Sequence, residues 1–278
     1  MSTAAVNLDQ AQSIIKGINI PPRPAALQAV LAEKQKDHPD LNKLAAIIAK
    51  DVTLAASVLK TINSPLYGLR RKVTSIKQAT IMLGFRTVSN LVTGISIRQA
   101  TSGSRLRLER FWDSATDVAI MGARLSKSLL LGDPEHAYLL GLFHDVGIPL
   151  MMLKYKDYKK VLIEANDSNQ TFTEIEEKYY PTNHAVVGYY VGRSWGIEKQ
   201  VCQGVLNHHS PRMLELDDPN VSSLLAIMKL AEHICHMNRR LSLDTEWEYH
   251  ADEILEYLGL DEDGYIEIRE EMTSLLAL

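Results

Sequence analysis

The sequence predicts an all-α fold, and three observations support this. Apolar residues recur at helical spacing along most of the 278 residues. No stretch alternates apolar and polar residues between hairpin turn signals, so no sheet is expected. Glycine, proline and asparagine interrupt the apolar periods at intervals of about one helix length, as is typical of helices joined by turns.

The composition is that of an ordinary globular protein, with 46% hydrophobic and 23% charged residues. A net charge of −4 argues against overall polyanion binding, so nucleic acid is not an expected partner. The two cysteines, Cys202 and Cys235, imply no disulfide framework and fit a reducing cytosol. No uninterrupted apolar segment approaches the ~18 residues of a membrane span, and residues 1–19 do not resemble a secretory signal. We therefore expect a cytoplasmic protein without a membrane segment.

The first hundred residues are expected to form a series of short helices. An amphipathic pattern covers residues 8–18, and the proline-rich stretch 20–24 must be extended because proline restrains the residue before it. Helices are predicted from Ala25 onward, after a cap at Asp40, and over residues 51–62. A further helix ends at Gly84 and another covers residues 85–98. Residues 100–103 are polar and contain a glycine, which indicates a boundary between two subdomains.

Turn residues break the helical pattern between Asn63 and Gly68. A buried asparagine must find several hydrogen-bond partners. We therefore predict that Asn63 is a satisfied structural hinge rather than a contact to a ligand.

The second half of the chain is predicted to contain longer helices. One covers residues 111–131, with small residues on its inner side, and the next leads from Pro134 toward residue 144. Thr173 and Glu176 fit a capping box. Further helices are predicted over residues 184–195, 198–207 and 222–238. From Trp247 onward the chain is acidic and amphipathic, and we expect a helical cap or a contact within a homo-oligomer.

An apolar run ending in His144 and Asp145 is the most informative stretch of the sequence. Gly147 follows, where helices commonly end in a left-handed residue. The run therefore predicts an imidazole and a carboxylate at the inner end of a buried helix. Burial of such groups is costly unless they are paired. They either satisfy each other or bind a metal ion.

Three histidines downstream favour the metal interpretation. His184 begins a helical pattern, and His208 and His209 close the next one. Four imidazoles and one carboxylate suit iron, manganese, nickel or zinc better than calcium or magnesium. The spacing is too long for a zinc finger, so the fold would have to bring these residues together.

These residues resemble the ligand order of the HD phosphohydrolase superfamily, especially its HD-GYP branch, and the chain is closer still to the HDOD (HD-related output domain) family. The resemblance covers roughly residues 15–240. It implies an HD-like helical bundle over residues 104–278, including a C-terminal helical cap, with an N-terminal helical subdomain over residues 1–103. The matching segments are Lys50–Leu54, Asn63-Ser64, Tyr67-Gly68, Ser75-Ile76, Leu83-Gly84, Phe111-Trp112 with Ala119, Gly141–Gly147, His184–Gly188, Trp195 and His208–Pro211.

Two positions depart from the catalytic branches of the superfamily. Ser114 stands where the first histidine ligand is expected, and serine is a poor ligand for a divalent transition metal. Glu232 stands where the last aspartate is expected. Glutamate can still bind a metal ion, but its extra methylene displaces the carboxylate by more than the tolerance of about 0.2 Å in a ligand distance. A binuclear centre is therefore in doubt, and a mononuclear, incomplete or empty site remains open.

The resemblance leaves two functions to be weighed. The first is a regulatory module of bacterial signal transduction that binds a ligand, a metal or a protein partner without turnover. The second is a metal-dependent phosphohydrolase acting on a nucleotide, a cyclic dinucleotide or another phosphoester, with Asp145 as metal ligand and proton acceptor. Ser114 and the uncharged Pro149 after the His-Asp segment favour the first.

Overall fold

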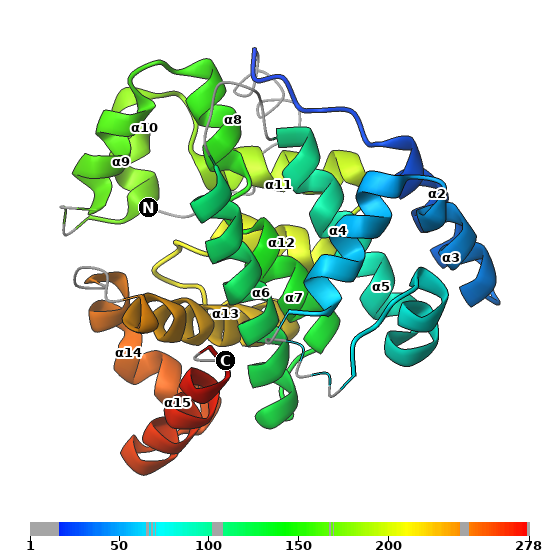
Figure 1. Cartoon of the computed structure of the whole chain (residues 1–278). Coiled ribbons are helices and arrows are strands. Elements are labelled where there is room, and N and C mark those ends of the chain that lie inside the picture. Colours follow the sequence, from blue (N-terminus) through cyan, green and yellow to red (C-terminus); the bar gives the residue numbers. More distant parts are fainter. Residues whose placement is uncertain are drawn as a thin grey trace.

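The computed structural model describes residues 17–276, apart from 65, 66, 68, 70, 102–107, 167, 169 and 240–244. These residues form helices and connecting loops with no strand among them, which confirms the predicted all-α class (Figure 1). The helices, labelled as in Figure 1, are α2 (Ala25–Lys34), α3 (Leu41–Ala49), α4 (Val52–Ile62), α5 (Ile76–Thr101), α6 (Glu109–Ser128), α7 (Pro134–Phe143), α8 (Gly147–Lys154), α9 (Tyr158–Asn166), α10 (Phe172–Tyr179), α11 (His184–Trp195), α12 (Lys199–Asn207), α13 (Pro219–Asn238), α14 (Thr245–Leu258) and α15 (Glu262–Leu276).

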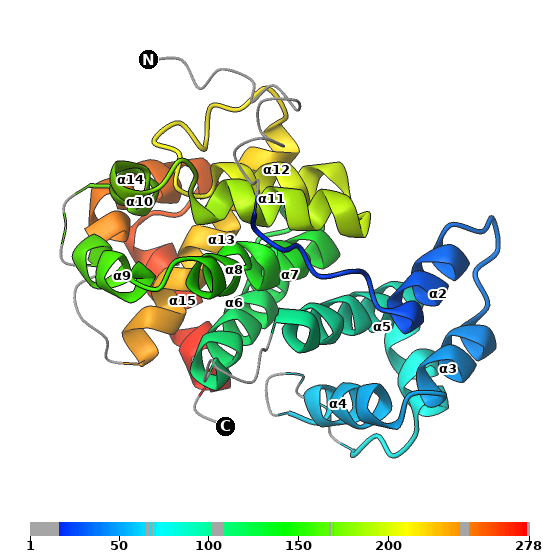
Figure 2. The same cartoon turned by 90° about the horizontal axis from the view of Figure 1, so that it is seen from above.

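Helices α2, α3 and α4 lie together at one side of the molecule and pack against α5 (Figure 2). Asp40 and Asp51 cap α3 and α4 by accepting backbone N–H hydrogen bonds at their N-termini. Gly84 divides α5 into two helices, because its φ of 79° and ψ of 172° are not helical. The predicted helix end at Gly84 is therefore confirmed. The predicted boundary at residues 100–103 and the helix over residues 8–18 lie largely outside the described residues.

Asn63 joins the end of α4 to the loop before α5. Its Nδ2 donates hydrogen bonds to the carbonyl oxygens of Leu59 and Val73, both at 2.8 Å. Its Oδ1 accepts a hydrogen bond from the backbone N–H of Val73, also at 2.8 Å. The side chain closes the loop as the sequence predicted for a structural hinge.

Replacing Asn63 with alanine should therefore destabilise the protein by about 2–3 kcal/mol, because the Val73 backbone groups lose their partners. Chemical denaturation of the variant would measure this change. The matched control is Asn166→Ala at an exposed position, where we expect a change within about 0.5 kcal/mol. An equally small change in Asn63→Ala would contradict the hinge role.

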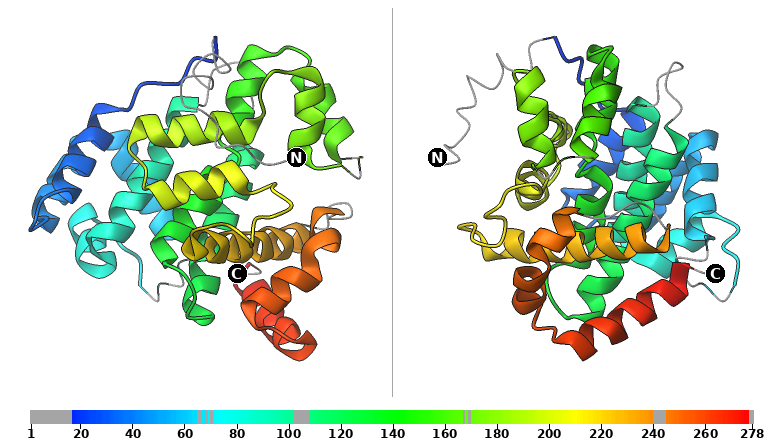
Figure 3. Two further views of the ribbon diagram at one scale, coloured as in Figure 1. Left: turned by 180° about the vertical axis from the view of Figure 1, so that it is seen from behind. Right: turned by 90° about the vertical axis from the view of Figure 1, so that its left-hand side faces the viewer.

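The second half of the chain is built around α6, α7 and α13. Gly141 of α7 lies against the backbone of α6, where an added Cβ would be 2.7 Å from Cα of Ala119. Helices α11 and α12 cover one side of this core, and α14 and α15 pack against α13 on the other (Figure 3). The extended segment before α2 contacts the end of α11, where the indole N–H of Trp195 donates to the carbonyl of Pro21 at 2.9 Å.

Two described helical stretches, Ile76–Thr101 and Pro134–Lys154, are long and apolar enough to cross a membrane by composition alone. In these stretches, 56% and 78% of the most apolar window is buried inside the fold. Such burial is typical of the core helices of a soluble protein.

Candidate functional site

The ends of three helices bring the predicted ligands together. His144 and Asp145 directly follow α7, His184 is the first residue of α11, and His208 and His209 directly follow α12. Asn183 caps the start of α11 beside His184, and Asp133 caps the opposite end of α7. The described residues thus bring five predicted site residues, from segments far apart in sequence, into one region of the fold.

Asp145, His184, His208 and His209 each offer a ligand atom, and these atoms all lie within 4.8 Å of one another. Oδ1 of Asp145 lies 3.3 Å from Nε2 of His184 and 3.5 Å from Nε2 of His208. His184 and His208 are fully buried, whereas Asp145 keeps 27% of its side chain exposed. The set has the size and chemistry of a site for one transition metal ion, with Asp145 facing solvent.

The three histidine rings of this group are held at Nδ1 and leave Nε2 for a ligand. Nδ1 of His208 donates to the carbonyl of Val205 at 2.7 Å. Nδ1 of His184 lies 2.7 Å from Oε2 of Glu176. Nδ1 of His209 lies 2.9 Å from Oε1 of Glu246. Such partners fix the ring orientation and the tautomer of histidines that bind metals, so the residues present fit a metal ion.

The buried histidines differ in charge. Burial opposes a charge on His184, but the Glu176 carboxylate and Asp145 outweigh it and raise the pKa of His184 to about 10. Burial lowers the pKa of His208 to about 3, and neighbouring His209 acts in the same direction. The two Nε2 atoms lie 3.2 Å apart, so the proton on His184 can be shared with the neutral ring. A metal ion would take the place of this proton, because metal ligands must be deprotonated.

His144 and Glu232 lie beside this four-residue group rather than within it. Nδ1 of His144 donates to the carbonyl of Gly141 at 2.7 Å. Its Nε2 lies 3.3 Å from Oδ2 of Asp145 and 3.2 Å from Oε1 of Glu232. Burial would raise the pKa of Glu232, but Lys229 and His144 outweigh it and lower the pKa to about 2. The roles of these two residues as metal ligands stay predictions.

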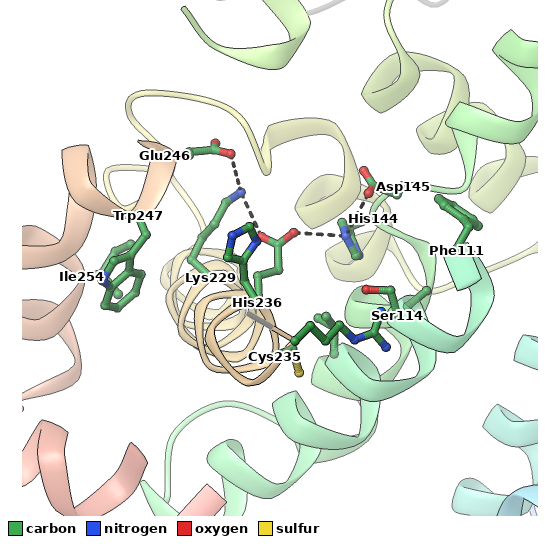
Figure 4. A pocket seen from close by; sticks show the side chains of 14 residues that line it. Phe111, Ser114, His144, Asp145, Lys229, Cys235, His236, Glu246, Trp247 and Ile254 are labelled. Carbon is green, nitrogen blue, oxygen red and sulfur yellow. Dashed lines mark ion pairs between the residues drawn. The ribbon is translucent and has the colours of Figure 1, made fainter. Parts of the chain in front are cut away.

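A cavity of about 230 Å³ lies beside the four-residue group, on the side of His144 and Glu232 (Figure 4). Ser114 lines it, together with His144, Asp145 and residues of α13 and α14. The two strong cations in its wall are already paired: Lys229 with Glu232 and Glu246, and Arg239 with Asp117.

Glu176 does not form the capping box that the sequence predicted. The capping box at the start of α10 is formed by Thr171 and Glu174, not by Thr173 and Glu176. Glu176 is instead fully buried, where it accepts hydrogen bonds from the Tyr158 hydroxyl and from the backbone N–H of His184. Its position one helical turn inside α10 points its carboxylate toward His184, which spacing alone did not indicate.

Gly147 also differs from its predicted role. It does not end a helix in the left-handed region but is the first residue of α8. A Cβ at this position would lie 2.0 Å from the carbonyl oxygen of His184. The glycine therefore permits the close approach of α8 to the start of α11.

Lys229 and Glu246 adjoin the predicted site residues, although no motif in the sequence indicates them. Glu246 comes from α14, directly before the segment predicted only as a cap or an oligomer contact, and it binds His209 and Lys229. The acidic composition of that segment is a weak signal, since most such side chains face solvent.

The HDOD domain family model matches residues 20–211. An uncharacterized protein of Treponema pallidum (strain Nichols) is 22% identical over 212 residues, which cover 74% of this chain and 41% of that protein. The uncharacterized protein YuxH of Bacillus subtilis (strain 168) is 28% identical over 130 residues, 47% of this chain and 32% of that protein. This chain thus spans less than half the length of either relative.

Solved structures share the fold. An HDOD domain protein of unknown function from Geobacter sulfurreducens has a TM-score of 0.72 at 21% identity, covering 97% of this chain and 98% of its own. A proposed phosphohydrolase from Shewanella amazonensis SB2B also has a TM-score of 0.72 at 21% identity, covering 95% and 98%. A proposed signal transduction protein from Marinobacter aquaeolei VT8 has a TM-score of 0.71 at 20% identity, covering 97% and 62%. The family model matches more than half of this chain, which therefore belongs to the HDOD domain family.

Proposed function

We propose that this chain is a regulatory module of cytoplasmic signalling in bacteria, whose HD-type pocket holds one divalent transition metal ion and does not turn over phosphoesters. The observation that carries the proposal is the convergence of four ligand atoms from Asp145, His184, His208 and His209 within 4.8 Å. Iron, manganese, nickel and zinc all suit this set of imidazoles and one carboxylate. The metal would link the ends of α7, α11 and α12, so its binding would be coupled to the conformation that a partner protein recognises.

Three features argue against hydrolysis. Ser114 lines the cavity and stands where the catalytic branches of the superfamily carry a histidine ligand. Pro149 in α8 supplies no charge for a phosphate group. The cations Lys229 and Arg239 in the cavity wall are matched by carboxylates, so little positive charge remains for the two or more charges of a phosphorylated nucleotide.

A specific observation keeps the phosphohydrolase as the second candidate. Asp145 is the exposed member of the metal group and lines the cavity, so a metal-bound water there could meet a substrate. A divalent metal lowers the pKa of bound water and polarises a phosphoryl oxygen. One relative with the same fold carries the name of a proposed phosphohydrolase. In this alternative Asp145 is both ligand and proton acceptor.

Two measurements together separate these functions. Plasma mass spectrometry gives the metal content of protein purified without chelators, and a phosphoester assay measures hydrolysis. We expect close to one transition metal ion per chain and no hydrolysis of bis(p-nitrophenyl) phosphate or of a cyclic dinucleotide. Metal-dependent turnover that Asp145→Ala abolishes would replace the regulatory proposal with the hydrolase.

His208→Ala should reduce metal affinity by roughly 100-fold or more, since it removes one of four ligands. The matched control is His38→Ala, at an exposed position before α3, which should keep the wild-type metal content. Equal metal content in both variants would place the metal elsewhere and contradict the site.

A further inference from the structure

Lys229 is a buried ammonium group next to the metal-ligand cluster. Only 6% of its side chain is exposed. Its Nζ lies 3.0 Å from Oε2 of Glu232 in the same helix and 3.1 Å from Oε2 of Glu246 in α14. Lysine is almost never buried unless it is paired, and here two carboxylates from different helices enclose the charge. The ion pairs run in Figure 4 from Glu246 through Lys229 and onward to His144.

The groups around Lys229 are themselves metal ligands by type. Glu232 accepts the lysine with one oxygen and meets Nε2 of His144 at 3.2 Å with the other. The His144 ring is held at Nδ1 by a backbone carbonyl, in the same way as the His208 ring. Two carboxylates from different helices thus meet at the Lys229 ammonium, and the His144 imidazole contacts the other oxygen of Glu232. A pair of carboxylates would suit a divalent cation such as Mn²⁺ if the ammonium were absent.

We propose that Lys229 is a built-in cation that takes the place of a second metal ion and limits the pocket to one. The inference deepens the proposed metal site and rests on it for the first ion. A divalent ion near Glu232 and Glu246 would have to displace an ammonium that both carboxylates already neutralise. It would also meet the repulsion of that positive charge in a poorly solvated environment. The lysine thus neutralises Glu232 and Glu246 as a second metal ion would, but it does not supply the coordination geometry of a metal.

Lys229→Met tests this inference, because methionine keeps a similar length and removes the charge. Calorimetric titration of metal-free protein with Mn²⁺ should give one ion per chain for the wild type and two for Lys229→Met. The metal-free variant should also lose thermal stability, on the order of 10 °C in Tm, because two partly buried carboxylates lose their partner. Added Mn²⁺ should restore that Tm by more than it shifts the wild type.

Two further variants serve as controls. Lys127→Met changes an exposed lysine of α6 and should leave both the stoichiometry and the Tm as in the wild type. Lys229→Met combined with Glu232→Gln should lose the added ion and keep the first, because Glu232 lies outside the four-residue group.

The outcomes separate this inference from the proposed function. One ion in both the wild type and folded Lys229→Met would overturn the inference and leave the metal site intact. No ion in the wild type but one in Lys229→Met, lost with Glu232→Gln, would support the role of the lysine and reject the first site. If Lys229→Met does not fold, Lys229→Gln is titrated instead. Failure of both variants to fold with excess Mn²⁺ would overturn the inference, since a metal then cannot replace the ammonium.

Discussion

Gly147→Ala should lower the free energy of unfolding by more than 3 kcal/mol and abolish metal binding. The added Cβ would lie 2.0 Å from the carbonyl oxygen of His184, 2.8 Å from its carbonyl carbon and 2.9 Å from its Cα. These are backbone atoms at the start of α11, which cannot rotate away as a flexible side chain would. Helix α8 must therefore move away from α11, and overpacking of this kind costs ~1–3 kcal/mol even where side chains can adjust. The same movement would displace His184 from Asp145.

Urea denaturation and Mn²⁺ titration of Gly147→Ala measure both effects. Gly122→Ala is the matched control, because its Cβ would meet its nearest neighbour, the carbonyl oxygen of Ala137, at an ordinary contact distance of 3.4 Å. We expect that control to change the unfolding free energy by less than about 1 kcal/mol. A Gly147→Ala protein with the stability of the control would show that α8 and α11 are not in the contact described.

Glu176→Ala should cost about 3–5 kcal/mol of stability, which is the penalty for removing one partner of a buried charged pair. The carboxylate is fully buried and accepts hydrogen bonds from Tyr158 and from both the backbone and the ring of His184. Without it, these donors have no acceptor and the His184 ring loses the contact that fixes its orientation. Loss of such a partner typically weakens metal binding by about 10- to 100-fold.

The conservative change Glu176→Gln separates the charge from the shape. Its amide keeps one oxygen as acceptor but no longer favours the charged form of His184, so the pKa of His184 should fall from about 10. Nuclear magnetic resonance titration of the imidazole in metal-free protein would follow this change. Glu256→Gln in α14, at an exposed position, is the control. An unchanged His184 pKa in Glu176→Gln would contradict the role assigned to the carboxylate.

The sequence predicted the parts of this molecule that depend on local patterns. A helix begins after Asp40 and another ends at Gly84, because each residue acts on adjacent backbone groups independently of distant contacts. Asn63 was predicted as a hinge because a buried amide must be satisfied locally. His144, Asp145 and His184 were singled out because they stand at the ends of apolar helices, where burial of polar groups requires a reason.

The remaining features depend on contacts between segments far apart in the chain. Glu174 completes the capping box with Thr171, and Glu176, two residues later in the same helix, is the buried acceptor. Only the packing of α10 on α11 decides which of these two carboxylates faces inward. Gly147 was predicted to end a helix because the sequence does not show its close contact with His184, which is 37 positions away. No sequence motif marks Lys229 or Glu246, because their ion pair forms only when α14 folds back onto α13.

Anomalous X-ray diffraction from crystals of the wild-type protein grown with Mn²⁺ would locate the bound metal. We expect one anomalous peak per chain, at coordination distance from Asp145 and from Nε2 of His184, His208 and His209. We also expect Lys229 to remain bound to Glu232 and Glu246 with no metal between them. A second peak beside Glu232, or no peak within reach of Asp145, would contradict the proposed single-metal pocket.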